Sequence, residues 1–289
     1  MKTVNVNDVH PALRRGLALV VAAIMILLMV SCNNDDATPD FTAEDTESAG
    51  LDAVDDYYFD DADDLATEAL MASDESGGRI SADERLICAA VSRTGTKASG
   101  TLTIDFGDGC TDPRGNVRMG SIVIVRTGAC DEVGATWAIT FENYSINGFT
   151  LEGTRTVKVV SATDSLIVCD ITLVGGKITW PDGRFATREV NRRREHHRNE
   201  NHLLDRLIIY GTAQGSLCNG RGYVIQILEP LVYDRSCVAE GVFIPVQGVK
   251  FIKHGDRELT VDYGDGTCDN TVTLTNKNGR TVRYTVEKK

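Results

Sequence analysis

The chain has 289 residues, of which 42 are Asp or Glu and 30 are Lys or Arg, and its formal net charge is −12. This balance argues against nucleic acid as a partner, because phosphate contacts require concentrated Lys and Arg. Aromatic residues make up 6% of the chain, so few aromatic rings are available for stacking on a sugar.

The N-terminus has the form of an export signal. Lys2, Arg14 and Arg15 precede an unbroken apolar run over residues 17–30. This run is shorter than the roughly 20 residues that a membrane-spanning helix needs. We therefore expect residues 1–31 to be a signal peptide.

The end of the run, Met29-Val30-Ser31-Cys32, resembles the lipobox of bacterial lipoproteins. The resemblance implies cleavage before Cys32 and acylation of its thiol and amine by fatty acids such as palmitate. Leu is usual at the position of Met29, and the alternative is a plain secretory signal or membrane anchor that contains a cysteine. Two or more acyl chains hold a protein stably on a membrane, so we expect a lipid-anchored protein.

An acidic segment follows the lipobox. Residues 33–78 contain 16 Asp or Glu and no Lys or Arg, whereas residues 79–289 are near neutral. The composition over 35–48 is typical of a disordered, self-repelling chain. The start of the segment, Asn-Asn-Asp-Asp at 33–36, resembles the acidic export signal of surface lipoproteins in the Bacteroidota, which implies a surface-exposed position on the outer membrane.

We interpret residues 32–78 as a lipidated cysteine followed by an acidic tether. Within the tether, several apolar residues have rough helical spacing: Val54, Tyr57, Tyr58, Leu65, Ala69 and Leu70. Two alternatives remain open here. One is a short helix over 52–72 that docks on the body, and the other is a solvated spacer.

Residues 79–289 alternate between apolar and polar residues, as half-buried strands do. The apolar positions of such runs are Leu102/Ile104/Phe106, Ile122/Ile124, Trp137/Ile139/Phe141 and Leu259/Val261/Tyr263. Turn signals separate the runs, and the Asn-Gly pairs at 147–148, 219–220 and 278–279 are strong hairpin signals. We predict a single all-β domain of ten or more antiparallel strands in hairpin order, forming a long twisted sheet, a sandwich or an open barrel.

Seven cysteines follow Cys32. An exported protein can keep disulfides, but an odd number leaves at least one cysteine free or paired between chains. We predict a disulfide between Cys237 and Cys268, which lie at the ends of adjacent strand runs. Cys169, within an apolar run, is predicted to be a buried hydrophobic residue.

A short motif occurs twice, as TLTIDFGDGC at 101–110 and as ELTVDYGDGTC at 258–268. Clustered carboxylates on a bent loop can supply oxygen ligands to calcium. The candidate ligands are Asp105, Asp108, Asp112, Asp262, Asp265 and Asp269. The alternative, which we favour, is that Gly-Asp-Gly turns the chain and that each Asp bonds nearby backbone N–H groups. Apart from calcium, no cofactor is expected.

The segment RRREHHRNENH at 192–202 could carry a ligand. Its histidines, His196, His197 and His202, are of the type that binds transition metals, but the surrounding arginines would repel a cation. Arg192, Arg193 and Arg194, with His196 and His197, are candidates for an anion-binding patch for acidic glycan or lipopolysaccharide. The alternative is a solvated hairpin end. Trp180, beside a Pro-Asp-Gly turn, could meet a ligand or cap the core.

The ordered motifs DFGDGC, PLVYDRSC and DYGDGTCDN, over about residues 98–275, resemble an uncharacterised family of Bacteroidota surface lipoproteins. The resemblance implies no activity and no catalytic residue. The chain also lacks a G-x-S-x-G nucleophile elbow and an H-E-x-x-H zinc motif. We therefore expect an outer-membrane lipoprotein with a non-enzymatic structural or binding role, whose partners are the membrane and a glycan or surface protein. The alternatives are an extracellular enzyme acting on polysaccharide and a calcium-dependent binding module.

Overall fold

The computed structural model describes residues 41–75, 83–96 and 98–287, with the side chains of residues 43, 44, 74 and 75 left out. The predicted signal peptide and Cys32 lie outside the described residues. All described residues belong to the unit Phe41–Lys289. No helix in the described part of the chain is long and apolar enough to cross a membrane.

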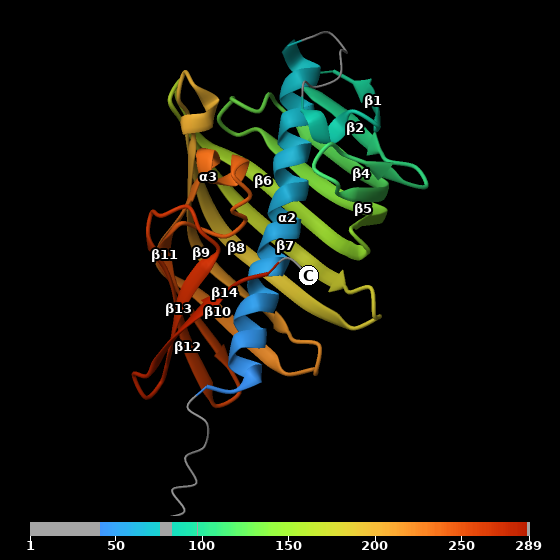
Figure 1. Ribbon diagram of the computed structural model, residues 1–289. Coiled ribbons are helices and arrows are strands. Elements are labelled where there is room, and N and C mark those ends of the chain that lie inside the picture. Colours follow the sequence, from blue (N-terminus) through green and yellow to red (C-terminus); the bar gives the residue numbers. More distant parts are fainter. Residues whose placement is uncertain (1–40, 76–82, 97, 288–289) are drawn as a thin grey trace, which may run out of the picture. The chain divides into compact units, whose positions relative to one another are not determined.

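The described residues form one 14-stranded sheet in which neighbouring strands are antiparallel and follow one another in chain order (Figure 1). The short strand β3 pairs with β4 beside this path. The strands are β1 (Ala90–Gly95), β2 (Ser99–Asp105), β3 (Cys110–Thr111), β4 (Val117–Thr127), β5 (Thr136–Ile146), β6 (Phe149–Ala162), β7 (Leu166–Thr179), β8 (Phe185–His197), β9 (Arg206–Ser216), β10 (Gly222–Asp234), β11 (Gln247–His254), β12 (Arg257–Asp265), β13 (Thr271–Asn276) and β14 (Thr281–Thr285).

The predicted antiparallel meander is therefore confirmed, and of the three architectures left open the structure shows a single long sheet that does not close on itself. The hairpin between β5 and β6 illustrates how the sequence encodes it. Asn147 has φ 52° and Gly148 has φ 83°, and a type I′ turn needs positive φ at both central residues.

Within the described residues one long helix, α2 (Ala43–Glu75), lies along the face that the curved sheet encloses (Figure 1). Among the residues of α2 whose burial is described, only Glu47 is exposed. The acidic segment therefore differs from the predicted tether. From Ala43 onward it is a helix of 33 residues, which is longer than the predicted 52–72 at both ends, and it is docked rather than solvated. The disorder predicted for 35–48 is wrong from Ala43 onward.

The face of the sheet turned toward α2 is the core. Alternate side chains of each strand point to it, among them Ile104, Ile124 and Ile139, each 0% exposed. Aromatic side chains of α2 meet them: the ring of Tyr58 lies 4.7 Å from that of Phe149. Because side chains alternate between the two faces of a strand, the other residues of each strand form an outer face that points away from α2.

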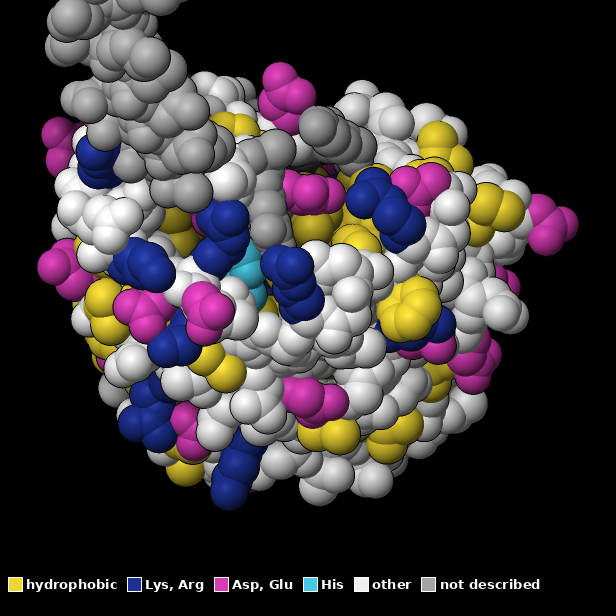
Figure 2. All heavy atoms as spheres, turned by 90° about the horizontal axis from the view of Figure 1, so that it is seen from below, with side chains coloured by type: hydrophobic (Ala, Val, Ile, Leu, Met, Phe, Trp, Pro, Cys, Tyr) yellow, Lys and Arg dark blue, Asp and Glu magenta, His cyan; other side chains and the backbone are white. Residues whose placement is uncertain are grey.

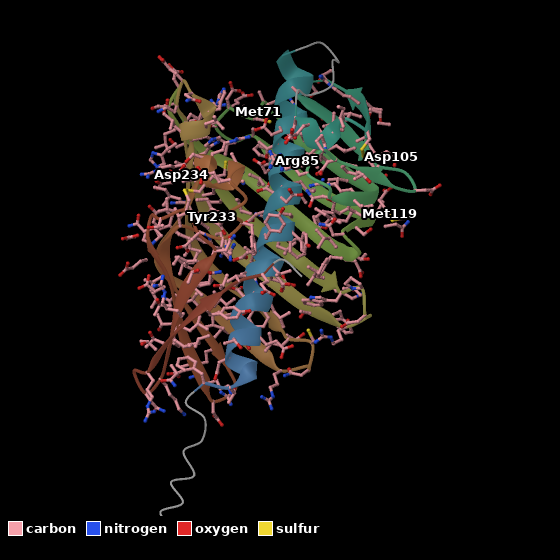
Figure 3. The ribbon with its side chains drawn as sticks, in the orientation of Figure 1. Met71, Arg85, Asp105, Met119, Tyr233 and Asp234 are labelled. Carbon is pink, nitrogen blue, oxygen red and sulfur yellow. A yellow bond between two sulfur atoms is a disulfide. The ribbon has the colours of Figure 1, made fainter. Side chains whose placement is uncertain are left out.

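Three shorter helices connect these elements: η1 (Glu84–Leu86), η2 (His202–Leu204) and α3 (Arg235–Ala239). The segment after α3 covers α2 on the side away from the sheet centre, where the ring of Phe243 lies 5.5 Å from that of Tyr57. Figure 3 shows Arg85, from η1, beside α2. The helix is thus surrounded by the sheet and by two connecting segments.

Candidate functional site

The first candidate is a cluster of buried charges between the middle of α2 and the sheet. We define the central ion-pair cluster as Asp52 and Asp56 of α2, Arg188 and Arg192 of β8, and Lys250 of β11. The Nζ atom of Lys250 lies 2.7 Å from a carboxylate oxygen of Asp52 and 2.7 Å from one of Asp56. Arg188 also pairs with both carboxylates, and Arg192 pairs with Asp56 at 2.8 Å. Each of the five residues is at most 6% exposed.

Further acidic residues of α2 pair with cations from other elements. Proceeding along the helix, the pairs are Asp45 with Arg257, Asp60 with Arg155, Asp63 with Arg155 and Arg194, Asp61 with Arg118 and Arg85, Asp64 with Arg85, and Glu68 with Arg235. The cations come from β4, β6, β8, β12, η1 and α3. Ion pairs therefore join α2 to strands in both halves of the sheet and to the connecting helices η1 and α3.

The carboxylates of α2 do not share one electrostatic state. Burial alone would raise the pKa of Asp56, but Arg188, Arg192 and Lys250 outweigh it and hold that pKa well below its ordinary value. Burial raises the pKa of Asp55 well above its ordinary value, and its Oδ1 atom has no hydrogen-bond partner among the described residues. Asp56 is therefore a charged partner of the cations, whereas Asp55 favours the protonated form.

The arginine-rich end of β8 lies largely within these ion pairs. Successive side chains of a strand point to opposite faces, so Arg192 and Arg194 point toward α2 and pair with Asp56 and Asp63. Arg193 points outward and pairs with Asp170 at 2.8 Å. The structure thus does not bring the three arginines together as an anion-binding patch.

The histidines of this segment are bonded to neighbouring carboxylates. His196 lies 3.0 Å from Asp205 and His197 lies 3.1 Å from Glu195. Burial lowers the pKa of His196, so this ring favours the neutral form. Among the residues that the structure describes, no group of three or more His, Cys, Asp or Glu side chains is placed to hold a metal ion.

Trp180, the candidate for stacking on a ligand, is 8% exposed, and its ring lies 6.3 Å from that of Phe149. Trp180 therefore packs against the core and does not lie on the outer face of the sheet. Both tryptophans of the chain are buried, since Trp137 is 3% exposed. Neither ring therefore offers a platform to a ligand in solution.

The aspartates of the first Gly-Asp-Gly motif have different local roles. Asp105, at the end of β2 and away from α2 (Figure 3), accepts hydrogen bonds from the N–H of Gly107 and the hydroxyl of Ser121. Asp108 is exposed. Asp112 is buried, and its carboxylate accepts a hydrogen bond from the side chain of Arg118.

The aspartates of the second Gly-Asp-Gly motif also accept hydrogen bonds from groups close to them in the chain. Asp262 accepts a bond from the N–H of Gly264 at 2.8 Å, Asp265 from the hydroxyl of Thr267, and Asp269 from the N–H of Thr271. Bonds of this type stabilise turns. The contacts of Asp262 and Asp269 with backbone N–H groups are of the kind that the turn alternative expects, whereas Asp265 bonds a hydroxyl.

Two disulfides join described residues. The predicted bond between Cys237 and Cys268 is present. The cysteine of the first motif, Cys110, pairs with Cys88, which the sequence did not predict. Cys169 is 3% exposed and forms no disulfide, as expected of a buried hydrophobic residue.

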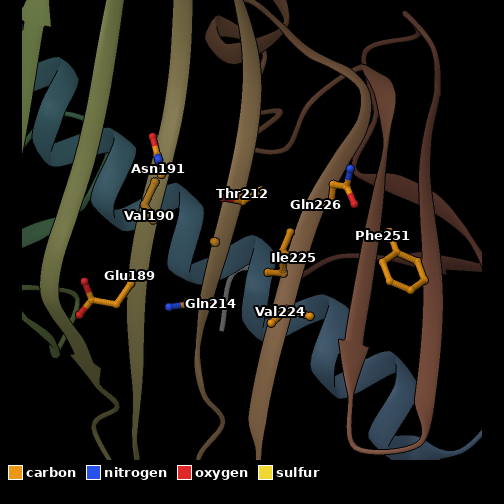
Figure 4. Close-up of a pocket in the computed structure, with 10 residues that line it drawn as sticks. Glu189, Val190, Asn191, Thr212, Gln214, Val224, Ile225, Gln226 and Phe251 are labelled. Atoms are coloured by element: carbon orange, nitrogen blue, oxygen red, sulfur yellow. The ribbon is translucent and has the colours of Figure 1, made fainter.

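The second candidate site is a pocket of about 490 Å³ on the outer face of the sheet. In Figure 4 it lies over β8 to β11, with α2 behind the strands. We call it the outer groove and define it by its lining residues: Glu189, Val190, Asn191, Thr212, Ala213, Gln214, Val224, Ile225, Gln226 and Phe251.

Four of the ten residues that line the outer groove are polar and neutral, five are apolar, and Glu189 is a carboxylate. The side chains of Asn191, Thr212, Gln214 and Gln226 are exposed, and none has a hydrogen bond with another side chain or backbone group within the described residues. Their donors and acceptors are therefore open to a ligand. The sequence did not identify these residues, because alternation shows only which residues face outward and not which strands are neighbours.

Comparison of the chain with protein-family models, with curated proteins and with solved structures finds no match. The class of protein is therefore described by the fold alone, which is an open antiparallel meander that encloses one acidic helix. Its two candidate sites lie on opposite faces of the sheet, and strands β8 and β11 contribute residues to both.

Proposed function

We propose that this chain is a lipid-anchored protein of the outer membrane, exposed at the cell surface, whose β body has a binding role and no catalytic one. The observation that carries the proposal is the division of polar groups between the two faces of the sheet. Ionisable groups with strongly shifted pKa values, such as Asp56 and Lys250, are paired with one another against α2. The accessible groove on the other face is lined mainly by neutral groups.

An enzyme site would combine these features differently. Catalytic groups with perturbed pKa values lie in accessible clefts, where substrate can reach them. A glycosidase, the alternative considered from the sequence, needs two carboxylates that flank the bond it cleaves. Glu189 is the one carboxylate among the residues that line the outer groove. A binding role therefore fits this groove better than hydrolysis.

The tether between the lipid anchor and the body is shorter than the sequence predicted, because most of the acidic segment belongs to α2. The chain enters the body at Phe41, so eight residues separate this point from Cys32, a span of at most about 30 Å. The acids from Asp45 to Glu68 belong to the body. An acylated Cys32 would thus hold the body close to the membrane surface rather than at the end of a long spacer.

The anchor is tested by metabolic labelling of expressing cells with an alkyne fatty acid. The wild-type chain should incorporate the label and sediment with outer membranes, and Cys32→Ala should do neither. Protease treatment of intact cells should cleave the wild-type chain if it faces outward. A wild-type chain that carries no label and stays soluble would refute the anchor.

A further inference from the structure

We propose that the outer groove binds a neutral glycan chain that lies across strands β8 to β11. The inference rests on the binding role proposed above and names its ligand. A glycan presents many hydroxyl groups, each of which donates and accepts hydrogen bonds, together with apolar C–H faces. Three properties of the groove match this chemistry: its open donors and acceptors, their arrangement in a row, and its lack of net positive charge.

The lining groups are of the kind that bond hydroxyls. Asn and Gln each carry an acceptor oxygen and two N–H donors, and Thr carries one donor and two acceptor positions. Asn191, Thr212 and Gln226 supply one such group from each of three adjacent strands. The carboxylate of Glu189 accepts the N–H of Gly175 at 2.8 Å, which holds it at the rim with acceptor capacity left.

These groups stand in register. Asn191 of β8 is paired with Thr212 of β9, and Thr212 is paired with Gln226 of β10. The row continues to Phe251 of β11, which is paired with Gln226. Since neighbouring strands lie about 4.8 Å apart, the four positions span about 14 Å in a line perpendicular to the strands. A linear oligosaccharide along this line would meet a polar group at each of three strands and then the half-buried ring of Phe251.

The strands beneath the row are held from behind. Arg192 adjoins Asn191 in β8, Lys250 adjoins Phe251 in β11, and both cations bond to Asp56 on the other face of the sheet. The two ends of the row are thus fixed to the same helical carboxylate. A rigid support of this kind lowers the entropy lost when a ligand binds.

Charge selects a neutral ligand over other classes. An anionic polymer requires clustered Lys and Arg, and no basic residue lines the groove. Figure 2, which views the end of the described unit where α2 begins, shows exposed charges of mixed sign there as well. A protein partner would need a larger surface with buried aromatic or arginine anchors, whereas Phe251 is the only aromatic lining residue.

The test is binding of the purified full chain in detergent to immobilised neutral and acidic polysaccharides, followed by calorimetry with neutral hexasaccharides of glucose, mannose and xylose. The groove variant is Asn191→Ala with Gln226→Ala. The matched control is Thr154→Ala with Lys158→Ala, two exposed outer-face residues of β6 that lie outside the groove. Thermal unfolding of each chain is measured first to show that both variants keep the fold.

Wild type and control should bind at least one neutral glycan with equal affinity. Loss of two hydrogen bonds of about 1 kcal/mol each should weaken the groove variant about 30-fold. Binding of none of the neutral glycans, binding of acidic polysaccharide alone, or equal affinity of wild type and groove variant would overturn the proposal.

Glycan binding and lipid labelling of the wild-type chain together separate this inference from the anchor. Glycan binding by a wild-type chain that carries no lipid label would reject the anchor and keep the groove site. Lipid labelling without glycan binding would reject the groove site alone.

Discussion

Replacing Asp56 with Asn tests whether the ion pairs of α2 stabilise the fold. The carboxylate of Asp56 is 4% exposed and pairs with Arg188, Arg192 and Lys250, the last at 2.7 Å. Asparagine keeps the shape of the side chain and removes its charge. Three buried cations then lose a shared counter-charge, and Asp52 remains as the charged partner of Arg188 and Lys250.

The expected loss is large because the charges are buried. Removing one partner of a buried ion pair typically costs about 3–5 kcal/mol, since it leaves the other charge uncompensated, and we expect about 4 kcal/mol here. With a urea m-value of about 3 kcal/mol per molar, the unfolding midpoint should fall by about 1.3 M. Fluorescence of the buried Trp137 and Trp180 and far-ultraviolet circular dichroism should report one coincident transition.

The pH dependence has a definite sign. The pKa of Asp56 is held well below its ordinary value, so its contribution is present above the unfolded pKa of about 4. That contribution is lost as pH falls through the folded pKa. The difference in stability between wild type and Asp56→Asn should therefore be constant around neutral pH and shrink in strong acid.

The matched control is Glu152→Gln, which removes an exposed ion pair with Lys177 and should cost less than about 1 kcal/mol. Arg192→Met in the Asp56→Asn background should restore part of the loss, because Arg192 pairs with Asp56 and not with Asp52 and is therefore the cation left uncompensated. If Asp56→Asn destabilises the chain no more than Glu152→Gln does, the view that these ion pairs hold α2 in the sheet is refuted.

Three further predictions concern stability. Asp55→Asn should raise the melting temperature at neutral pH, and the increase should vanish below about pH 4. The pKa of Asp55 is raised in the folded state, so its contribution to stability is complete below the unfolded pKa and is lost as pH rises through the folded pKa. A difference in melting temperature that stays unchanged across a pH series of thermal scans would contradict this. Replacing both Cys237 and Cys268 with Ser opens a loop of 31 residues and should lower the free energy of unfolding by about 3.7 kcal/mol on the chain-entropy model, as measured in urea. Gly211→Ala should lower the free energy of unfolding by about 3 kcal/mol, because the new Cβ would lie 2.3 Å from a carbonyl oxygen of β8 and the residue has φ +120°. The control Gly220→Ala has open space around it and should cost no more than about 1–2 kcal/mol. Equal losses of stability would show that the close approach of β9 to β8 is unimportant.

The sequence predicted the strands well because their signal is local. Alternation placed Leu102 and Ile104 on one face, and both are at most 1% exposed. Asn-Gly at 147–148 marked a hairpin turn that the structure contains. The disulfide of Cys237 with Cys268 was accessible to the same reasoning, since both cysteines adjoin predicted strand ends. The pairing of Cys88 with Cys110 was missed because Cys88 precedes the first recognisable strand.

The acidic segment shows where local reasoning failed. Its composition is that of a disordered chain, because isolated carboxylates repel one another and bury little apolar surface. In the folded unit, cations from the sheet, from η1 and from α3 offset much of this repulsion: Asp52, for example, pairs with Lys250, 198 positions further along the chain. Arg188 and Arg194 of β8 likewise pair with carboxylates of α2 that are more than 130 positions away in the chain.

By itself, then, the sequence determined the class of fold, the hairpin order and one disulfide, since the signals for these lie in short local stretches of the chain. Only the tertiary structure decided that the acidic run is the centre of the body, that Arg192 and Arg194 face it, and that Asn191, Thr212 and Gln226 form one row. Charge pairing and strand register join residues that are distant in the chain. Their geometry exists only once the sheet has formed around the helix.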